Sequence, residues 1–245
     1  FDALIARPVR SMASAFVCKS RMAREYVIAG GVKPERAFVV PVGFKRDNYA
    51  RVDEPMLGRW AGPGQDKLLL SECRLVCEKR NDTAIRAMSR VVKDFPNVGY
   101  VVLGSGPELE GLRQLVLDLG LESSVHLVTE KVVNSEMNAY YSGAYLYLIP
   151  SSYEIFNMTM LESLACGVPV IASRVGGMAD VIEPGVNGYL IDPGDDAALA
   201  EYICRVASDE GLRREMSAKA EAGAADYDWE RIAEKFLEVY DRLRA

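Results

Sequence analysis

Short apolar runs alternate with amphipathic stretches along most of this 245-residue chain. Within the stretches between the runs, apolar residues recur every three or four positions, as they do on one face of a helix. Strands that are apolar on both faces are typical of a parallel sheet covered by helices on both sides. The pattern therefore predicts an α/β fold with a doubly wound parallel sheet. The expected strands are residues 67–71, 98–103, 124–128, 144–149, 168–172 and 188–191.

The expected helices lie between these strands and after the last one. They cover residues 83–95, 104–119, 134–142, a stretch that contains Glu162, a short stretch after Gly177, and most of the chain beyond residue 191. Before residue 67 we expect strands at 15–18 and 37–40, with a helix from Ser20 to Gly30 between them. Residues 41–66 are rich in Pro and Gly, so we expect a linker and a domain boundary there.

Two glutamates mark one of the loops that follow a strand. Glu154 lies in the loop after strand 144–149, and Glu162 lies in the helix that this loop enters. Free N–H groups and the positive dipole end at a helix start suit a phosphate, and carboxylates suit the hydroxyls of a sugar. The combination predicts a nucleotide-sugar site. On the spacing of the glutamates alone, a solvated helix face is the commoner explanation.

Other loops at the same sheet edge add cations and glycines. Arg74 and Lys79 follow strand 67–71, where two cations would stabilise the charge on a departing diphosphate. A solvated charged loop is the alternative for this segment. Gly104 opens a Gly-Ser-Gly-Pro turn after strand 98–103 that lets the backbone approach a ligand closely, although a plain strand-to-helix turn has the same composition.

Charge is distributed unevenly and excludes some functions. The net charge is −6, yet residues 1–50 hold nine Lys/Arg against four Asp/Glu. This basic opening segment is a candidate contact with an anionic membrane surface or substrate, and an ordinary solvated helix face is the simpler alternative. No basic stripe with interleaved aromatics is present, so we expect no nucleic-acid binding. No apolar run approaches the roughly 20 residues of a membrane span.

The cysteines and the histidine predict no metal site. The five cysteines form no CxxC pair and are odd in number, which favours reduced thiols in a cytoplasmic protein. The single histidine, His126, lies in an expected strand, where a structural role is commoner than acid–base catalysis. The chain begins with Phe1 and without a signal-peptide pattern, so we expect a fragment or an excised domain.

Seven stretches in order resemble the C-terminal, donor-binding half of a GT-B glycosyltransferase, most closely the retaining enzymes of family four. The resemblance runs from about residue 15 to residue 240, and the block from Glu154 to Pro169 is its most specific part. The matching stretches are Val40-Pro41-Val42-Gly43-Phe44; Cys73-Arg74-Leu75 with Lys79; Leu103-Gly104-Ser105-Gly106-Pro107; Pro150-Ser151 with Glu154 and Glu162; Cys166 to Ser173; Gly176-Gly177 with Asp180; and Gly185 to Leu190.

The resemblance implies a role for each matching residue. Arg74 and Lys79 would hold the donor diphosphate, Glu162 the ribose hydroxyls, and Glu154 would lie by the transferred sugar. Backbone amides from Phe156 onward would reach sugar and phosphate, and residues 128–131 would hold the base. The catalytic candidates are thus Glu154, Arg74 and Lys79, and the donor-binding candidates are Glu162, Phe156, Asn157, Met158, Thr159, Gly104, Val128 and Thr129.

The implied activity is transfer of a sugar from a nucleoside-diphosphate sugar to an acceptor with retention of configuration. No resident cofactor and no metal ion are implied. The acceptor, whether a glycan, a lipid or a small molecule, would bind to an N-terminal domain, of which only the last part is expected here. The expected division is residues 1–40 as that terminal part, 41–66 as linker, 67–228 as the Rossmann-like nucleotide-sugar domain, and 229–245 as a helix that crosses back.

Several positions depart from the family pattern. Asn157 replaces a glycine after Phe156, so a side chain lies where backbone would approach the sugar. Cys73 and Arg80 also stand where glycines are usual, Asp180 replaces a glutamate, and Thr129 stands where a glycine is common. The departures leave two alternatives open: a nucleotide-sugar-binding subunit completed by a partner chain, and a GT-B-like sugar-nucleotide epimerase.

Overall fold

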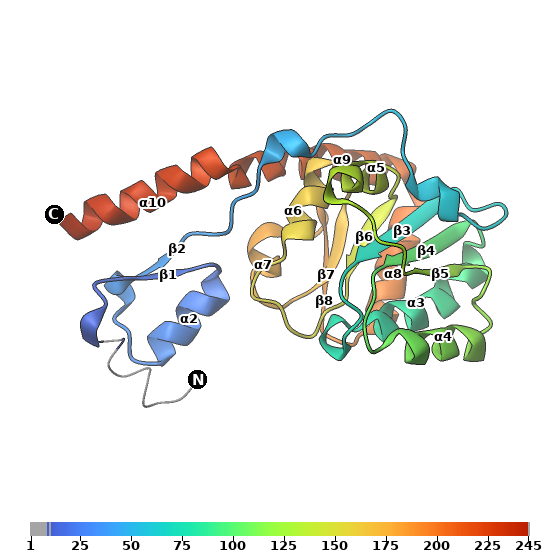
Figure 1. Ribbon diagram of the computed structural model, residues 1–245, viewed down its shortest axis with the longest axis horizontal. Coiled ribbons are helices and arrows are strands. Elements are labelled where there is room, and N and C mark those ends of the chain that lie inside the picture. The colour runs from blue at the N-terminus through green and yellow to red at the C-terminus, as the bar shows by residue number, and fades with distance from the viewer. Residues whose placement is uncertain (1–8, 10, 245) are drawn as a thin grey trace.

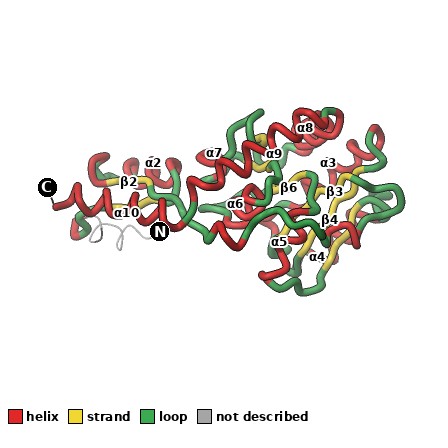
Figure 2. The backbone as a smooth tube through the Cα atoms, turned by 90° about the horizontal axis from the view of Figure 1, so that it is seen from above, coloured by secondary structure: helices red, strands yellow, loops and turns green. Residues whose placement is uncertain are grey.

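The computed structural model describes residue 9 and residues 11–244. At one end of the molecule, strands β1 (Phe16–Cys18) and β2 (Ala37–Val39) pair in parallel, and α2 (Arg21–Ala29) connects them. The C-terminal helix α10 (Trp229–Arg244) extends over this small unit (Figures 1 and 2). The basic residues Arg7 and Arg10 of the expected opening segment lie outside the described residues.

The larger part of the molecule is built on a six-stranded sheet in which every pairing is parallel. The spatial order is β5-β4-β3-β6-β7-β8, so the chain builds outward from β3 to one edge and then returns to place β6 on the other side of β3. The strands are β3 (Lys67–Glu72), β4 (Val98–Leu103), β5 (Val125–Val128), β6 (Leu146–Ile149), β7 (Val170–Ser173) and β8 (Gly188–Ile191).

Helices cover both faces of this sheet (Figure 1). One face packs against α3 (Asn81–Asp94), α4 (Leu109–Asp118) and α8 (Asp196–Ser208). The other packs against α5 (Met137–Ser142), α6 (Met158–Ala165), α7 (Met178–Val181) and α9 (Glu210–Ala224). Along β3, Leu68 and Leu70 belong to the α5–α6 side and Leu69 to the α3 side, because successive side chains of a strand point to opposite faces.

The structure confirms the predicted fold class and places the predicted strands within two residues of their expected ends. Some helix starts differ. The helix expected from residue 104 begins only at Leu109, because the glycine turn first makes a wider loop that folds over Leu75. The stretch expected as a helix from residue 134 begins with a 3₁₀ turn, Asn134–Glu136, before α5.

The expected linker packs against the sheet domain. Phe44 is 2% exposed and Leu57 is fully buried, and both belong to the hydrophobic core on the α5–α6 side. The backbone of Phe44 also pairs with that of Tyr227 and Trp229. A separate small core forms between β2 and α10 from Val40, Ile232 and Val239. The division into domains stays a prediction.

An ion pair joins the small unit to the sheet domain. The Arg21 guanidinium at the start of α2 lies 2.8 Å from a carboxylate oxygen of Asp180 in α7. The Arg21 backbone N–H donates to the same carboxylate at 2.6 Å. Asp180 therefore works as an acceptor for the start of α2. In the part of the chain that the structure describes, no helix is long and apolar enough to cross a membrane.

Candidate functional site

The loops of interest meet at the carboxyl ends of the strands, next to the point where the strand order reverses. Strands β3 and β6 are neighbours there, although the chain between them also forms β4 and β5. In sheets of this kind the diverging loops leave a crevice at that point, and ligands bind in it. Two hollows lie in this region, and they share Glu72 and Cys73 in their walls.

The larger hollow is an open cleft of about 390 Å³ between the loops that follow β3, β4 and β5. Arg74, Gly104 and Thr129 line it, together with Lys131. The Arg74 guanidinium is exposed and makes no hydrogen bond or ion pair with any described residue. Gly104 is required by close packing, because a Cβ at this position would overlap the carbonyl oxygen of Cys73. The cleft therefore contains a cationic side chain without an ion-pair partner among the described residues, Arg74, beside the closely packed backbone at Gly104.

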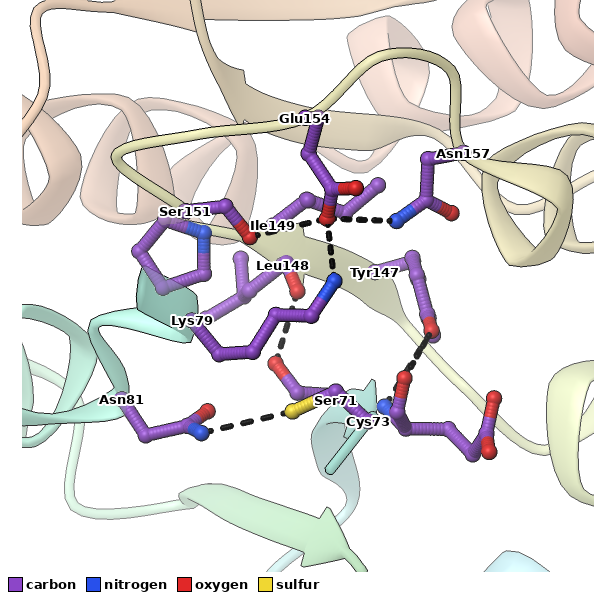
Figure 3. Close-up of a pocket in the computed structure, with 12 residues that line it drawn as sticks. Ser71, Cys73, Lys79, Asn81, Tyr147, Leu148, Ile149, Ser151, Glu154 and Asn157 are labelled. Atoms are coloured by element: carbon purple, nitrogen blue, oxygen red, sulfur yellow. Dashed lines mark hydrogen bonds and ion pairs between the residues drawn. The ribbon is translucent and has the colours of Figure 1, made fainter. Parts of the chain in front are cut away.

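The second hollow is a narrow crevice beside the first, and Lys79, Glu154 and Asn157 line it. These three side chains point toward one another (Figure 3). The Lys79 ammonium lies 2.5 Å from Oε1 of Glu154, and the Ser151 hydroxyl and the Asn157 amide donate to the same oxygen at 3.1 and 3.2 Å. The sequence predicted that Lys79 would project as a free cation, and the structure shows that it does not. It is held by Glu154, with both side chains at most 20% exposed.

An unusual backbone conformation at Arg80 places Lys79 at the crevice. Arg80 has φ 50° and ψ 40°, and no other described residue apart from glycines has a positive φ. It ends the 3₁₀ turn Cys77–Lys79 and directs the chain into α3. The left-handed conformation is unfavourable for a residue with a Cβ, which explains why a glycine suits this position better. The Arg80 side chain forms a two-bond pair with Asp82, at 3.0 and 3.2 Å.

Asn157 is the N-cap of α6. Its Oδ1 accepts from the Met160 backbone N–H at 2.9 Å and from the Thr159 hydroxyl at 2.7 Å. The expectation of free N–H groups at this helix start therefore needs a correction, because the Asn157 side chain accepts the hydrogen bond of one of them, the N–H of Met160. The backbone N–H groups of Phe156, Asn157, Met158 and Thr159 find no acceptor among the described residues. Four backbone donors thus remain open beside the crevice, together with the positive end of the helix dipole.

The double-glycine loop after β7 supports the loop that bears Glu154. Gly176 has φ 53°, and a Cβ there would overlap the carbonyl oxygen of Glu154. A Cβ at Gly177 would likewise overlap the ring of Phe156. The Gly177 N–H donates to the Ile155 carbonyl at 3.1 Å. These two glycines therefore determine how close the Glu154 loop lies to α7.

Glu162 is half-buried in α6 and lines neither hollow. Its Oε2 accepts a hydrogen bond from the Tyr141 hydroxyl at 3.0 Å, and the Tyr49 hydroxyl lies near the same carboxylate. Burial and the Glu162 carboxylate raise the pKa of Tyr49 well above its usual range, which keeps that hydroxyl a donor. Glu162 thus already accepts one hydrogen bond, from Tyr141.

Glu72, which the sequence analysis did not single out, lines both hollows. Burial raises the pKa of its carboxyl, and repulsion from Glu162 raises it further, while Lys79 acts in the opposite direction. The only sequence signal was a charged residue two positions after the apolar run at residues 68–70. At the end of a strand, such a residue is easily taken for the start of a solvated loop.

The remaining predicted site residues take supporting places. Met158 and Phe156 are half-buried against the α5–α6 core, and Phe156 packs on the ring of Tyr227. Val128 is buried, and its carbonyl accepts the N–H of Gly104, which aligns the loops after β4 and β5. In the described part of the chain, no group of three or more His, Cys, Asp and Glu side chains could hold a metal ion.

Comparison with known proteins yields one family and a set of relatives. Residues 57–223 match the profile of the family "Glycosyl transferases group 1". The chain is 33% identical over 228 residues to a D-inositol 3-phosphate glycosyltransferase of Acidothermus cellulolyticus, covering 89% of this chain and 50% of that protein. It is 30% identical over 217 residues to N-acetyl-alpha-D-glucosaminyl L-malate synthase of Bacillus anthracis, covering 87% and 56%. The chain thus spans about half the length of these relatives.

Solved structures share the fold. Anabaena HepE in complex with UDP superposes with a TM-score of 0.86 at 23% identity, covering 96% of this chain and 66% of that one. Sucrose-phosphate synthase from Thermosynechococcus elongatus gives a TM-score of 0.83 at 24% identity, covering 99% and 62%. The small unit, the linker and the sheet domain are therefore all arranged as in proteins of known structure.

Proposed function

The chain belongs to the family of glycosyl transferases group 1, and from this membership we propose that it supplies the donor site of a retaining glycosyltransferase. In this proposal the six-stranded domain binds a nucleoside-diphosphate sugar, and the sugar passes to an acceptor held elsewhere in the complete protein. UDP is one candidate for the nucleotide, since the similar structure of HepE contains it.

The observation that supports this proposal best is a set of uncommitted donors at one sheet edge. Arg74 has no partner in the cleft, and four consecutive backbone N–H groups, from Phe156 to Thr159, are open at the start of α6. A diphosphate presents several anionic oxygens that such groups bind. Because the donors lie on both sides of the switch point, a diphosphate would bridge the loops after β3 and β6.

The same groups would assist departure of the leaving group. When the bond between the sugar and the phosphate breaks, negative charge grows on the nucleoside diphosphate, and fixed donors that face this charge lower the barrier. Lys79 would contribute if it exchanged its contact with Glu154 for a phosphate oxygen. Glu154 would then be released to accept hydrogen bonds from hydroxyls of the transferred sugar.

One observation favours a second function, a binding subunit without transfer activity. The Asn157 side chain lies in the crevice where the sugar is expected, and it bonds to Glu154. A protein that only binds the nucleotide part would tolerate this arrangement. Intact Arg74, Lys79, Glu154 and Glu162 support the enzyme instead.

Transfer by the complete protein distinguishes the two functions. The enzyme would release UDP or GDP from a UDP-sugar or GDP-sugar, and proton NMR of the product would show the anomeric configuration of the donor retained. Arg74→Ala should reduce turnover, whereas Arg113→Ala, an exposed arginine of α4, serves as the matched control. Binding without release of nucleotide would favour the subunit, and an inverted product would rule out the retaining mechanism.

A further inference from the structure

Glu72 occupies the centre of the proposed donor site. It is the last residue of β3, the strand beside the switch point, and it lines both the cleft and the crevice. Its side chain points to the same face as Leu68 and Leu70, which is the face covered by α5 and α6. Glu162 of α6 lies near enough for the two carboxylates to repel each other.

The Glu72 carboxylate lacks a donor. Its backbone N–H and carbonyl both bond to the Tyr147 hydroxyl, at 3.1 and 3.2 Å, but no described residue forms a hydrogen bond or an ion pair with its side chain. A half-buried carboxylate without donors is unfavourable, and burial with repulsion from Glu162 raises its pKa accordingly. Any ligand that brings hydroxyl groups into the cleft would relieve this deficit.

Glu162, by contrast, has part of its capacity filled. One of its oxygens accepts a hydrogen bond from the Tyr141 hydroxyl, and the Tyr49 hydroxyl lies near the same carboxylate. A ribose carries two neighbouring hydroxyls, each of which donates one hydrogen bond. In a nucleoside diphosphate the ribose lies between the base and the phosphates, and Glu72 lies in the cleft wall with both Thr129 and Arg74.

We propose that Glu72 is a ribose-recognition residue that accepts a hydrogen bond from a ribose hydroxyl of the donor nucleotide, beside Glu162. The inference rests on the proposed donor site and adds a specificity to it: the protein selects ribonucleotides over deoxyribonucleotides through an acceptor at the end of β3. The step is one of binding alone, since no bond of the nucleotide forms or breaks in it.

Calorimetric titrations test this inference with UDP and GDP and with the 2′-deoxy and 3′-deoxy form of each. The wild-type chain should bind the ribonucleotide more tightly than one deoxy form by about tenfold, the value of one hydrogen bond to a charged group. Glu72→Ala should weaken binding of the ribonucleotide by about the same factor and leave that deoxy form nearly unchanged. Glu72→Gln keeps an acceptor oxygen without the charge, so its loss should be smaller.

Glu78→Ala is the matched control, because Glu78 is an exposed carboxylate of the same segment. It should preserve the preference for ribose. The inference is overturned if Glu72→Ala weakens the binding of ribose and deoxyribose nucleotides equally, or weakens the binding of neither. If binding still depends on Arg74 in that case, the proposed function stands. If the folded wild-type chain binds none of the nucleotides, the proposed function fails and the inference fails with it.

Discussion

Substitutions of Asn157 separate its two roles, as cap of α6 and as donor to Glu154. Asn157→Ala removes both, whereas Asn157→Ser keeps a capping oxygen but is too short to reach Glu154. Loss of an N-cap destabilises by about 1 kcal/mol. Loss of the bond to Glu154 adds about 1 kcal/mol, below the usual value for a charged acceptor, because Lys79 and Ser151 still donate to the same oxygen.

We therefore expect Asn157→Ala to lower the free energy of unfolding by about 2 kcal/mol and Asn157→Ser by about 1 kcal/mol. For a chain of this size, each kcal/mol shifts Tm by about 2–4 °C. Differential scanning calorimetry and urea denaturation without nucleotide measure both variants under identical conditions. If Asn157→Ser loses as much stability as Asn157→Ala, the cap has no energetic role. If neither variant loses stability, the hydrogen bonds of Asn157 are not maintained in solution.

Three further predictions follow from the same region. Arg80→Gly should be more stable than Arg80→Ala by about 1 kcal/mol in urea denaturation, because both lose the pair with Asp82 but only Gly accepts the left-handed backbone; equal stabilities would contradict this. Gly176→Ala should lower Tm and weaken nucleotide binding, since its Cβ displaces the Glu154 loop; unchanged binding would refute it. Glu72→Gln should be more stable than the wild type at pH 7, and the stabilities of the two should converge in acid. The pKa of Glu72 is raised in the folded state, so the wild type keeps its full stability below about pH 4.3 and loses part of it as the pH rises through that pKa. A difference in stability that does not depend on pH would refute this prediction.

The fold was predictable because its determinants are local and repeat along the chain. Runs such as residues 98–103 are apolar at almost every position, which is typical of a strand covered on both faces. The family resemblance also rested on such stretches and is confirmed by the match to glycosyl transferases group 1. The start of α4 was predicted wrongly because Gly104 and Gly106 close over Cys73 and Leu75, a contact that no local pattern reveals.

The site was predictable as a list of residues and not as a set of contacts. Lys79 and Glu154 are 75 positions apart, and their ion pair depends on how two loops meet. The cap formed by Asn157 follows from the preference of Asn for that position, so the sequence contained a signal for it. Glu72 stands out because no neighbouring residue that the structure describes donates a hydrogen bond to its carboxylate. This can be recognised only from the three-dimensional surroundings of the side chain.

The difference in affinity between UDP and UMP, and between GDP and GMP, tests the central claim most directly. If Arg74 and the open amides of α6 hold a diphosphate, the wild-type chain binds the diphosphate at least about tenfold more tightly than the monophosphate. That gap should shrink in Arg74→Ala and persist in Arg113→Ala when both are measured by calorimetry at the same ionic strength. Equal affinity of the wild-type chain for diphosphate and monophosphate, or a gap that Arg74→Ala leaves intact, would contradict the account.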